Sequence, residues 1–234
     1  MRGGKEAPNP IPTLDPMTDS VRRRAERVEV RVSRERILAA ADALCSSGTR
    51  GLTMSELSKA AGIGNATLYR RFPDVESVLR ALHERHMEHF AAIARAVGGQ
   101  PSGWDAVVVT IEGIVDTLIA HPAIPHVYRR LAQVDTGFRL GPEWDGPLRA
   151  IVEVAQREGA LRPDVDANDV AMAAFRLGEF AHHPEPERGI IVARQLAITI
   201  DGLRASSATT ALPGQPISTD TVNDLIRREG AAGE

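Results

Sequence analysis

Apolar residues recur with the 3.6-residue period of an α-helix through nearly all of the chain between two atypical tails. The spacing predicts a first helix from an N-cap at Ser33 to Gly48, a long helix that ends at Gly98, and further helices at about 103–120, 124–135, 144–159, 166–182 and 186–205. No segment has strand period, and only 4% of the residues are aromatic, so the core must consist largely of Ala, Leu, Ile and Val. Such a core favours closely packed helices over a β-sandwich. The chain is therefore predicted to be all-α.

Charge is unevenly distributed along the chain. The net charge is −3, but residues 21–90 hold 13 basic against 9 acidic residues, whereas residues 91–234 hold 13 against 19. A basic N-terminal third indicates that one end of the molecule meets a polyanion. The alternative is a solvated charged face with no partner.

Other features exclude several classes of protein. Cys45 is the single cysteine, so no intrachain disulfide and no Cys-based zinc site can form. The chain has no run of 18 apolar residues and no stretch that resembles a signal peptide, so a cytoplasmic protein that does not span a membrane is expected. No nucleophile-and-base motif or phosphate-binding loop is present, so neither catalysis nor a cofactor is expected.

Residues 51–73 carry the most specific pattern. Thr53 and Glu56 have the spacing of a capping box, and Gly62 supplies the left-handed residue of a sharp turn between two helices. A second short helix starts at Gly64 or Asn65 and ends before Pro73. This arrangement predicts a helix-turn-helix, whose second helix enters the major groove of DNA. An ordinary helical hairpin with solvated polar residues is the alternative.

Residues 34–90 resemble the DNA-binding domain of the TetR family of transcriptional regulators. The matching residues are Ile37, Leu38, Ala39, Ala40, Ala41, Leu44, Gly48, Thr53, Leu57, Ala60, Ala61, Gly62, Thr67, Leu68, Tyr69 and Phe72. Two positions depart from the family pattern. Val75 replaces a lysine that often contacts phosphate, and Ala66 replaces a frequent glycine.

The resemblance implies which residues meet DNA. Phosphate contacts are expected from Thr53, Tyr69 and Arg70, base contacts from Asn65, Ala66 and Thr67, and additional positive charge from Arg71. This division follows the general rule that phosphate contacts position a protein and base contacts specify the sequence.

The resemblance also implies a domain organisation. Residues 1–32 are expected to be a disordered, arginine-containing extension, 33–80 the helix-turn-helix domain, 81–205 a helical domain for effector binding and dimerisation, and 206–234 a flexible tail in which 218–229 has the pattern of a short helix. The arginines of the extension fit either an arm that reaches DNA or a solvated extension of the first helix. The segments 166–182 and 186–205 are expected to pair across a two-fold axis, through an apolar stripe formed by Ile190, Ile191, Leu196, Ile200 and Leu203. Core packing is the alternative for this stripe.

An effector pocket is expected among the central helices. Its candidate lining residues are Trp104, His121, His126, Tyr128, Phe138, Trp144, Met172 and Phe175. Few charges interrupt these helices, which indicates a largely apolar small molecule. His83, His86 and His89 advance three residues at each step and drift around their helix, so they are not expected to bind a metal.

These features together predict a homodimeric transcriptional regulator, most simply a repressor that a small molecule releases from a palindromic operator in double-stranded DNA. The alternative is a DNA-binding dimer that responds to a protein partner or to no ligand.

Overall fold

The computed structural model describes residues 16–47, 52–135, 137–139, 141–206 and 210–231. Within these residues the chain forms ten α-helices, one short 3-10 helix and no strand, which confirms the predicted all-α class. The helices are α1 (Pro16–Ser46), α2 (Met54–Ala61), α3 (Asn65–Arg71), α4 (Val75–Val97), α5 (Gly103–Ala120), α6 (Ala123–Val134), α7 (Pro142–Arg157), α8 (Ala167–Gly178), η1 (Glu179–His182), α9 (Glu187–Leu203) and α10 (Thr219–Ala231). The five expected helices between 103 and 205 correspond to α5, α6, α7, α8 with η1, and α9.

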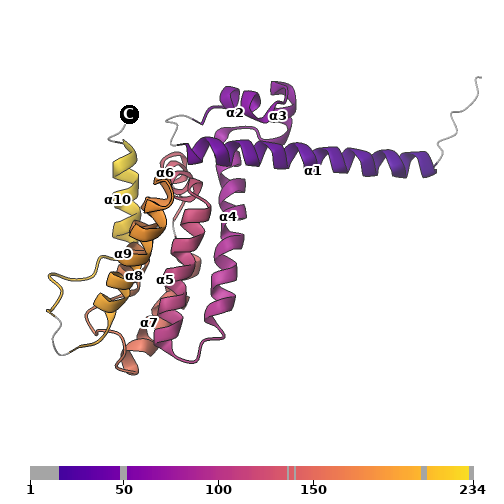
Figure 1. Ribbon diagram of the computed structural model, residues 1–234. Helices are drawn as coiled ribbons and strands as arrows, with labels where there is room; N and C mark the ends of the chain where they lie inside the picture. The colour runs from indigo at the N-terminus through magenta and orange to yellow at the C-terminus, as the bar shows by residue number, and fades with distance from the viewer. Residues whose placement is uncertain (1–15, 48–51, 136, 140, 207–209, 232–234) are drawn as a thin grey trace, which may run out of the picture.

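The helices form two packed groups, and α4 belongs to both of them. Helix α1 lies across one end of the molecule with α2 and α3 above it, and the remaining helices run away from it as a bundle (Figure 1). One core is built from α1–α4 and includes Ile37, Leu57 and Leu68, and the other is built from α4, α5 and α7–α9 around Ile111. Helix α4 contributes to both cores, and so does α6. The two cores are therefore connected through α4 and α6.

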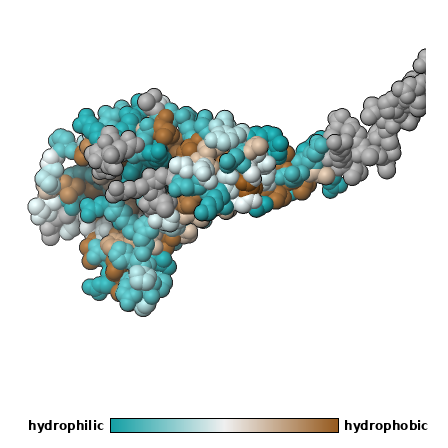
Figure 2. Space-filling view, turned by 90° about the horizontal axis from the view of Figure 1, so that it is seen from above, coloured by the Kyte–Doolittle hydropathy of each residue, from teal (hydrophilic) through white to brown (hydrophobic). Residues whose placement is uncertain are grey.

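Helix α1 begins well before the expected domain boundary. It starts at Pro16, so residues 16–32 are helical rather than disordered, and Ser33 lies inside the helix with its hydroxyl donating to the carbonyl of Val30 over 2.9 Å. No glycine or further proline interrupts residues 17–46, and straight-chain residues of high helix propensity are frequent there. The other part of the predicted extension, residues 1–15, lies outside the described residues. The space-filling view shows α1 projecting from the body as a narrow arm (Figure 2).

The C-terminal tail also differs from its expectation. Residues 210–218, here called the strap, run along the body, and α10 packs against α6 rather than extending as a flexible tail. The side chain of Asn168 in α8 donates to the carbonyl of Ile217 over 2.8 Å. The tail is therefore part of the folded domain.

Two further expectations concern single features. Cys45 is buried in the first core, and burial raises the pKa of its thiol to about 11. Among the described residues no single helix is long and apolar enough to cross a membrane, and α5 and α6 approach the required length only together, across a bend of 88°.

Candidate functional site

The start of the helix-turn-helix has the predicted capping box. The Thr53 hydroxyl accepts the backbone N–H of Glu56 over 3.2 Å, and the backbone N–H of Thr53 donates to Glu56 Oε2 over 3.1 Å. The two residues satisfy each other's unpaired amides at the first turn of α2. Thr53 remains exposed beyond this exchange.

The turn between α2 and α3 is held from both sides. Gly62 has φ 62° and ψ 41°, the left-handed conformation that its position in the motif predicted. Within the turn, the Ser58 hydroxyl donates to the carbonyl of Ile63 over 2.7 Å. From α1, the Arg36 guanidinium donates to the carbonyl of Ala61 over 2.8 Å and to that of Gly62 over 3.2 Å. A Cβ at Gly62 would lie 3.0 Å from this guanidinium, so the turn requires glycine for two reasons.

Helix α3 presents one face to solvent and the other to the core. Leu68 and the adjoining Phe72 are buried between α1 and α4. The exposed face carries Asn65, Ala66, Tyr69 and Arg70, with Thr67 partly exposed beside them. The Tyr69 side chain is 54% exposed, which is unusual for a large aromatic residue and typical of a contact surface.

Arg71 differs from its predicted neighbours in the motif. Its Nε donates to the hydroxyl of Ser33 in α1 over 3.1 Å, so its side chain lies against α1 rather than on the exposed face of α3. The Arg34 guanidinium lies 4.8 Å from the centroid of the Phe72 ring and joins the same two helices. Arg34, Arg36 and Arg71 thus fix the position of α3. Nothing in the arginine-rich sequence of α1 distinguishes Arg34 and Arg36 from the neighbouring arginines.

The three histidines of α4 point to different partners. His86 is buried and its Nε2 lies 2.9 Å from Asp42 Oδ1 in α1, and this hydrogen bond lowers the pKa of Asp42. His89 stacks on His121 with ring centroids 3.9 Å apart, and His83 packs edge-on against Tyr128. No group of three metal-binding side chains occurs within the described part of the chain. The histidines instead join α4 to α1 and to the start of α6.

A cavity of about 430 Å³ lies in the bundle between helices α4 to α8 and α10. Four of the predicted pocket residues, Tyr128, Trp144, Met172 and Phe175, line it. The others lie elsewhere: Trp104 packs under the Arg204 guanidinium, His121 stacks on His89, His126 faces His182, and Phe138 packs against His83. Sequence periodicity places a residue on a buried face, but it does not say whether that face is packed or hollow.

Helix α10 supplies lining residues that the sequence analysis did not include. Thr219, Val222, Asn223 and Ile226 all line the cavity. The helical spacing of these residues is visible in the sequence. The strap before them contains proline and glycine, so the sequence does not indicate where α10 packs on the rest of the protein.

An exposed reading helix, braced by α1 and joined through α4 to a separate helical bundle, defines a helix-turn-helix transcriptional regulator. Residues 37–82 match the family model described as bacterial regulatory proteins of the tetR family. An uncharacterised HTH-type transcriptional regulator of Mycobacterium tuberculosis (strain H37Rv) is 33% identical over 128 residues, which covers 53% of this chain and 66% of the relative. A relative in Mycobacterium bovis gives the same figures, so the match spans just under two thirds of either relative. Residues 37–82 therefore form a DNA-binding domain of the TetR-family type.

Solved structures support the same fold. The ketosteroid transcriptional regulator KstR2 of Mycobacterium tuberculosis has a TM-score of 0.61 at 18% identity, with 74% of this chain and 95% of that chain covered. A gamma-butyrolactone receptor (ArpA-like protein) has a TM-score of 0.58 at 20% identity, with 87% and 97% covered. These relatives and neighbours are regulators rather than enzymes, in agreement with the absence of a catalytic motif.

Proposed function

We propose that this chain is a homodimeric repressor of the cytoplasm, which leaves a palindromic operator when a small, largely apolar molecule occupies the cavity. The observation that carries the DNA-binding part is the exposed face of α3, where Asn65, Tyr69 and Arg70 project from a helix whose other face is buried. In this proposal residues 33–80 bind DNA, and residues 81–205 dimerise and bind the effector together with α10, which lines the cavity.

The individual DNA contacts follow from the exposed face. Thr53, Tyr69 and Arg70 are assigned to phosphates, and Asn65, Ala66 and Thr67 are assigned to base edges. Arg71, which is held by Ser33, is assigned the orientation of α3 instead. In vitro selection from random duplexes should return a palindrome with half-sites about 34 Å apart or a multiple of that distance. Recovery of asymmetric sites alone would contradict a two-fold symmetric dimer.

Asn65→Ala and Arg70→Ala should weaken operator binding in different ways. Asn65→Ala should cost about 1–3 kcal/mol and relax the preference at one base position, because an amide forms a bidentate pair with one base edge. Arg70→Ala should weaken binding to all sequences alike and reduce the slope of log affinity against log salt by about one. Titrations of operator variants at several salt concentrations measure both effects.

Arg95→Ala provides the control for charge, since Arg95 is also exposed but lies in the last turn of α4, far from α3. It should leave both affinity and salt slope unchanged. Equal weakening of every operator variant by Asn65→Ala would show that Asn65 does not read a base.

The projecting part of α1 should add sequence-independent affinity. Residues 16–32 precede the α1 residues that contact α2 and α3 and, as a helix, extend about 25 Å. Arg24, Arg27 and Arg31 are exposed along this arm, while Glu26 and Glu29 moderate its charge. Deletion of residues 1–30 should raise the dissociation constant several-fold at low salt and much less at high salt, because phosphate contacts are screened.

The double substitution R24Q/R27Q keeps residues of good helix propensity and should reproduce part of this loss. Fluorescence anisotropy with labelled duplexes measures it. An affinity that is unchanged at both low and high salt would show that the arm takes no part in DNA binding.

The effector part of the proposal depends on the lining of the cavity. Phe90, Ile93, Ile114, Phe175 and other apolar side chains form most of its wall. Because Trp144 lines the cavity and Trp104 does not, the variant Trp104→Phe leaves one tryptophan that reports on it. Titration of this variant with lipophilic metabolites should shift or quench its emission. A full set of such compounds without effect would favour a regulator that answers a protein partner or no ligand.

A further inference from the structure

Helix α10 forms one wall of the cavity, although it lies beyond the last helix of the predicted effector domain. Val222 and Ile226 face the cavity from α10, and across it lie Trp144 of α7, with Met172 and Phe175 of α8. Leu225, on the other side of α10, is 44% exposed and does not line the cavity. The helix therefore has an apolar face that covers the cavity and an outer face in solvent.

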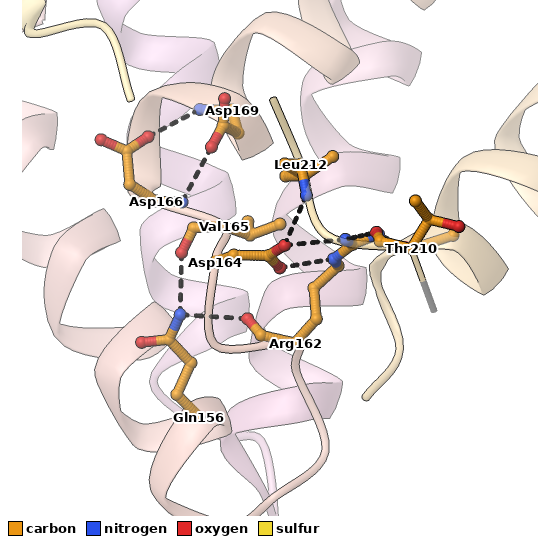
Figure 3. Close-up of polar contacts among 9 residues, drawn as sticks. Gln156, Arg162, Asp164, Val165, Asp166, Asp169, Thr210 and Leu212 are labelled. Atoms are coloured by element: carbon orange, nitrogen blue, oxygen red, sulfur yellow. Dashed lines mark hydrogen bonds and ion pairs between the residues drawn. The ribbon is translucent and has the colours of Figure 1, made fainter. Parts of the chain in front are cut away.

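A partly buried ion pair anchors the strap that leads into α10. Arg162 donates to both carboxylate oxygens of Asp164, over 2.6 and 2.9 Å, and also donates to the carbonyl of Thr210 over 2.7 Å (Figure 3). Asp164 accepts the backbone N–H of Leu212 over 2.8 Å. These hydrogen bonds hold the pKa of Asp164 well below its usual range. We refer to Arg162 and Asp164 as the clasp, because the pair fixes the strap on both sides of residue 211.

Beyond the clasp, α10 is held much less firmly. Thr219 Oγ1 lies 3.0 Å from Asp145 Oδ1 and 3.1 Å from Asn168 Oδ1, and its single proton serves one of these oxygens at a time. Asn223 is the one buried side chain among those described in α10, whereas α5 buries nine residues. An element with few buried apolar contacts opens at lower free energy than the core. The strap is thus fixed by the clasp at one end and by the Asn168–Ile217 hydrogen bond at the other, and the helix that follows packs against α6 and buries few of its side chains.

We propose that α10 is the gate of the small-molecule site: it turns outward about the clasp to admit a ligand and closes over it as the final wall. This inference rests on the proposed effector function. The ligand is uncharged and mainly apolar with one hydrogen-bonding end, because the wall is mostly apolar while Asn168, Thr219 and Asn223 form a polar edge. The four charged lining residues, Arg129, Asp145, Arg176 and Glu179, are two of each sign and together favour neither sign.

Matched substitutions on the two faces of α10 test whether it belongs to the site. The probe is N-phenyl-1-naphthylamine, an uncharged apolar dye excited directly. Val222→Trp places bulk in the cavity and should weaken dye binding by about tenfold, because the added ring occupies space that the dye needs. Leu225→Trp places the same side chain in solvent and should leave the affinity within about twofold. Equal affinities for both variants, or no saturable binding by the unaltered protein, would overturn the proposal.

The rates test whether α10 moves. In the full chain, Asp164→Asn weakens the clasp, and this variant should release the dye about tenfold faster in stopped-flow measurements. In the intact chain, hydrogen exchange at residues 219–228 should be faster than in α5 and should slow when the dye binds. Unchanged release together with dye-independent exchange would show that α10 is a fixed wall and no gate.

These results are separable from those on DNA. The α10 variants leave α1–α3 intact, so their operator affinity without ligand should equal that of the unaltered protein. Loss of operator binding in the Asn65 and Arg70 experiments would therefore bear on the proposed function and not on the gate.

Discussion

Replacing Ile198 by glutamate should convert the protein to a monomer and abolish operator binding at concentrations where the unaltered protein is dimeric. Ile190 and Ile198 of α9 are 58% and 59% exposed, and the partly exposed Ile191 lies beside them. An exposed apolar face of this kind indicates an interface. A charge buried there without a partner should raise the dimer dissociation constant by about a hundredfold or more. Analytical ultracentrifugation and operator titration measure the two consequences.

Ile198 is a cleaner site for this test than the residues that the sequence suggested. Leu196 and Ile200 pack against the core of their own chain, and Leu203 is buried, so a charge at any of them would unfold the protomer. For the oligomeric state, Val28→Glu is the matched control, because Val28 is 46% exposed on the α1 arm, away from α9. A dimer that survives Ile198→Glu would move the interface off α9.

Leu68→Ala should destabilise the α1–α3 layer by about 2–5 kcal/mol and eliminate specific DNA binding. Leu68 is fully buried, and α3 has seven residues, too few for a helix to be stable alone. Its position depends on the Leu68 and Phe72 contacts and on the Arg71–Ser33 hydrogen bond. Loss of the leucine side chain should therefore disorder the reading surface before the bundle melts.

Two signals distinguish this effect from general unfolding. Both tryptophans lie in the bundle, in α5 and α7, so their emission follows the second core, while far-ultraviolet circular dichroism follows all helices. Leu225→Ala, the same change at an exposed position, should alter stability by less than about 0.5 kcal/mol. Unimpaired operator binding by Leu68→Ala would show that Leu68 does not determine the position of α3.

The sequence predicted those parts of the structure that local rules determine. The capping box at Thr53, the left-handed Gly62 and the inward direction of Leu68 each follow from a few neighbouring residues, and each is present. Several helix ends between 97 and 187 lie beside glycine or proline for the same reason, among them the end of α4 at Val97 and the starts of α7 at Pro142 and α9 at Glu187. The family resemblance then supplied the DNA-facing positions, which remain predictions.

The sequence did not predict the features that depend on contacts between residues far apart in the chain. The arrangement of Arg71 depends on Ser33, 38 residues away, and the strap depends on Arg162, 48 residues before Thr210. Composition suggested disorder for residues 16–32 because it registers few apolar residues, yet the helix of α1 continues through them on intrinsic propensity. Trp104 and Phe138 were predicted to line a pocket because both are aromatic residues of the central region. In the structure, Arg204 covers Trp104 and His83 packs against Phe138, and neither contact can be predicted from local sequence.

The burial of Cys45 makes the chain suitable for site-directed labelling. It is the single cysteine of the sequence, and a thiol with a pKa of about 11 forms very little of the reactive thiolate at neutral pH. A cysteine introduced at an exposed position would therefore be the one thiol that reacts quickly with maleimides or spin labels. With Val222→Cys, the reaction rate of the thiol would report directly how often the inner face of α10 meets solvent. A spin label at position 225 would measure the distance between the two α10 helices of a dimer without first removing the native cysteine.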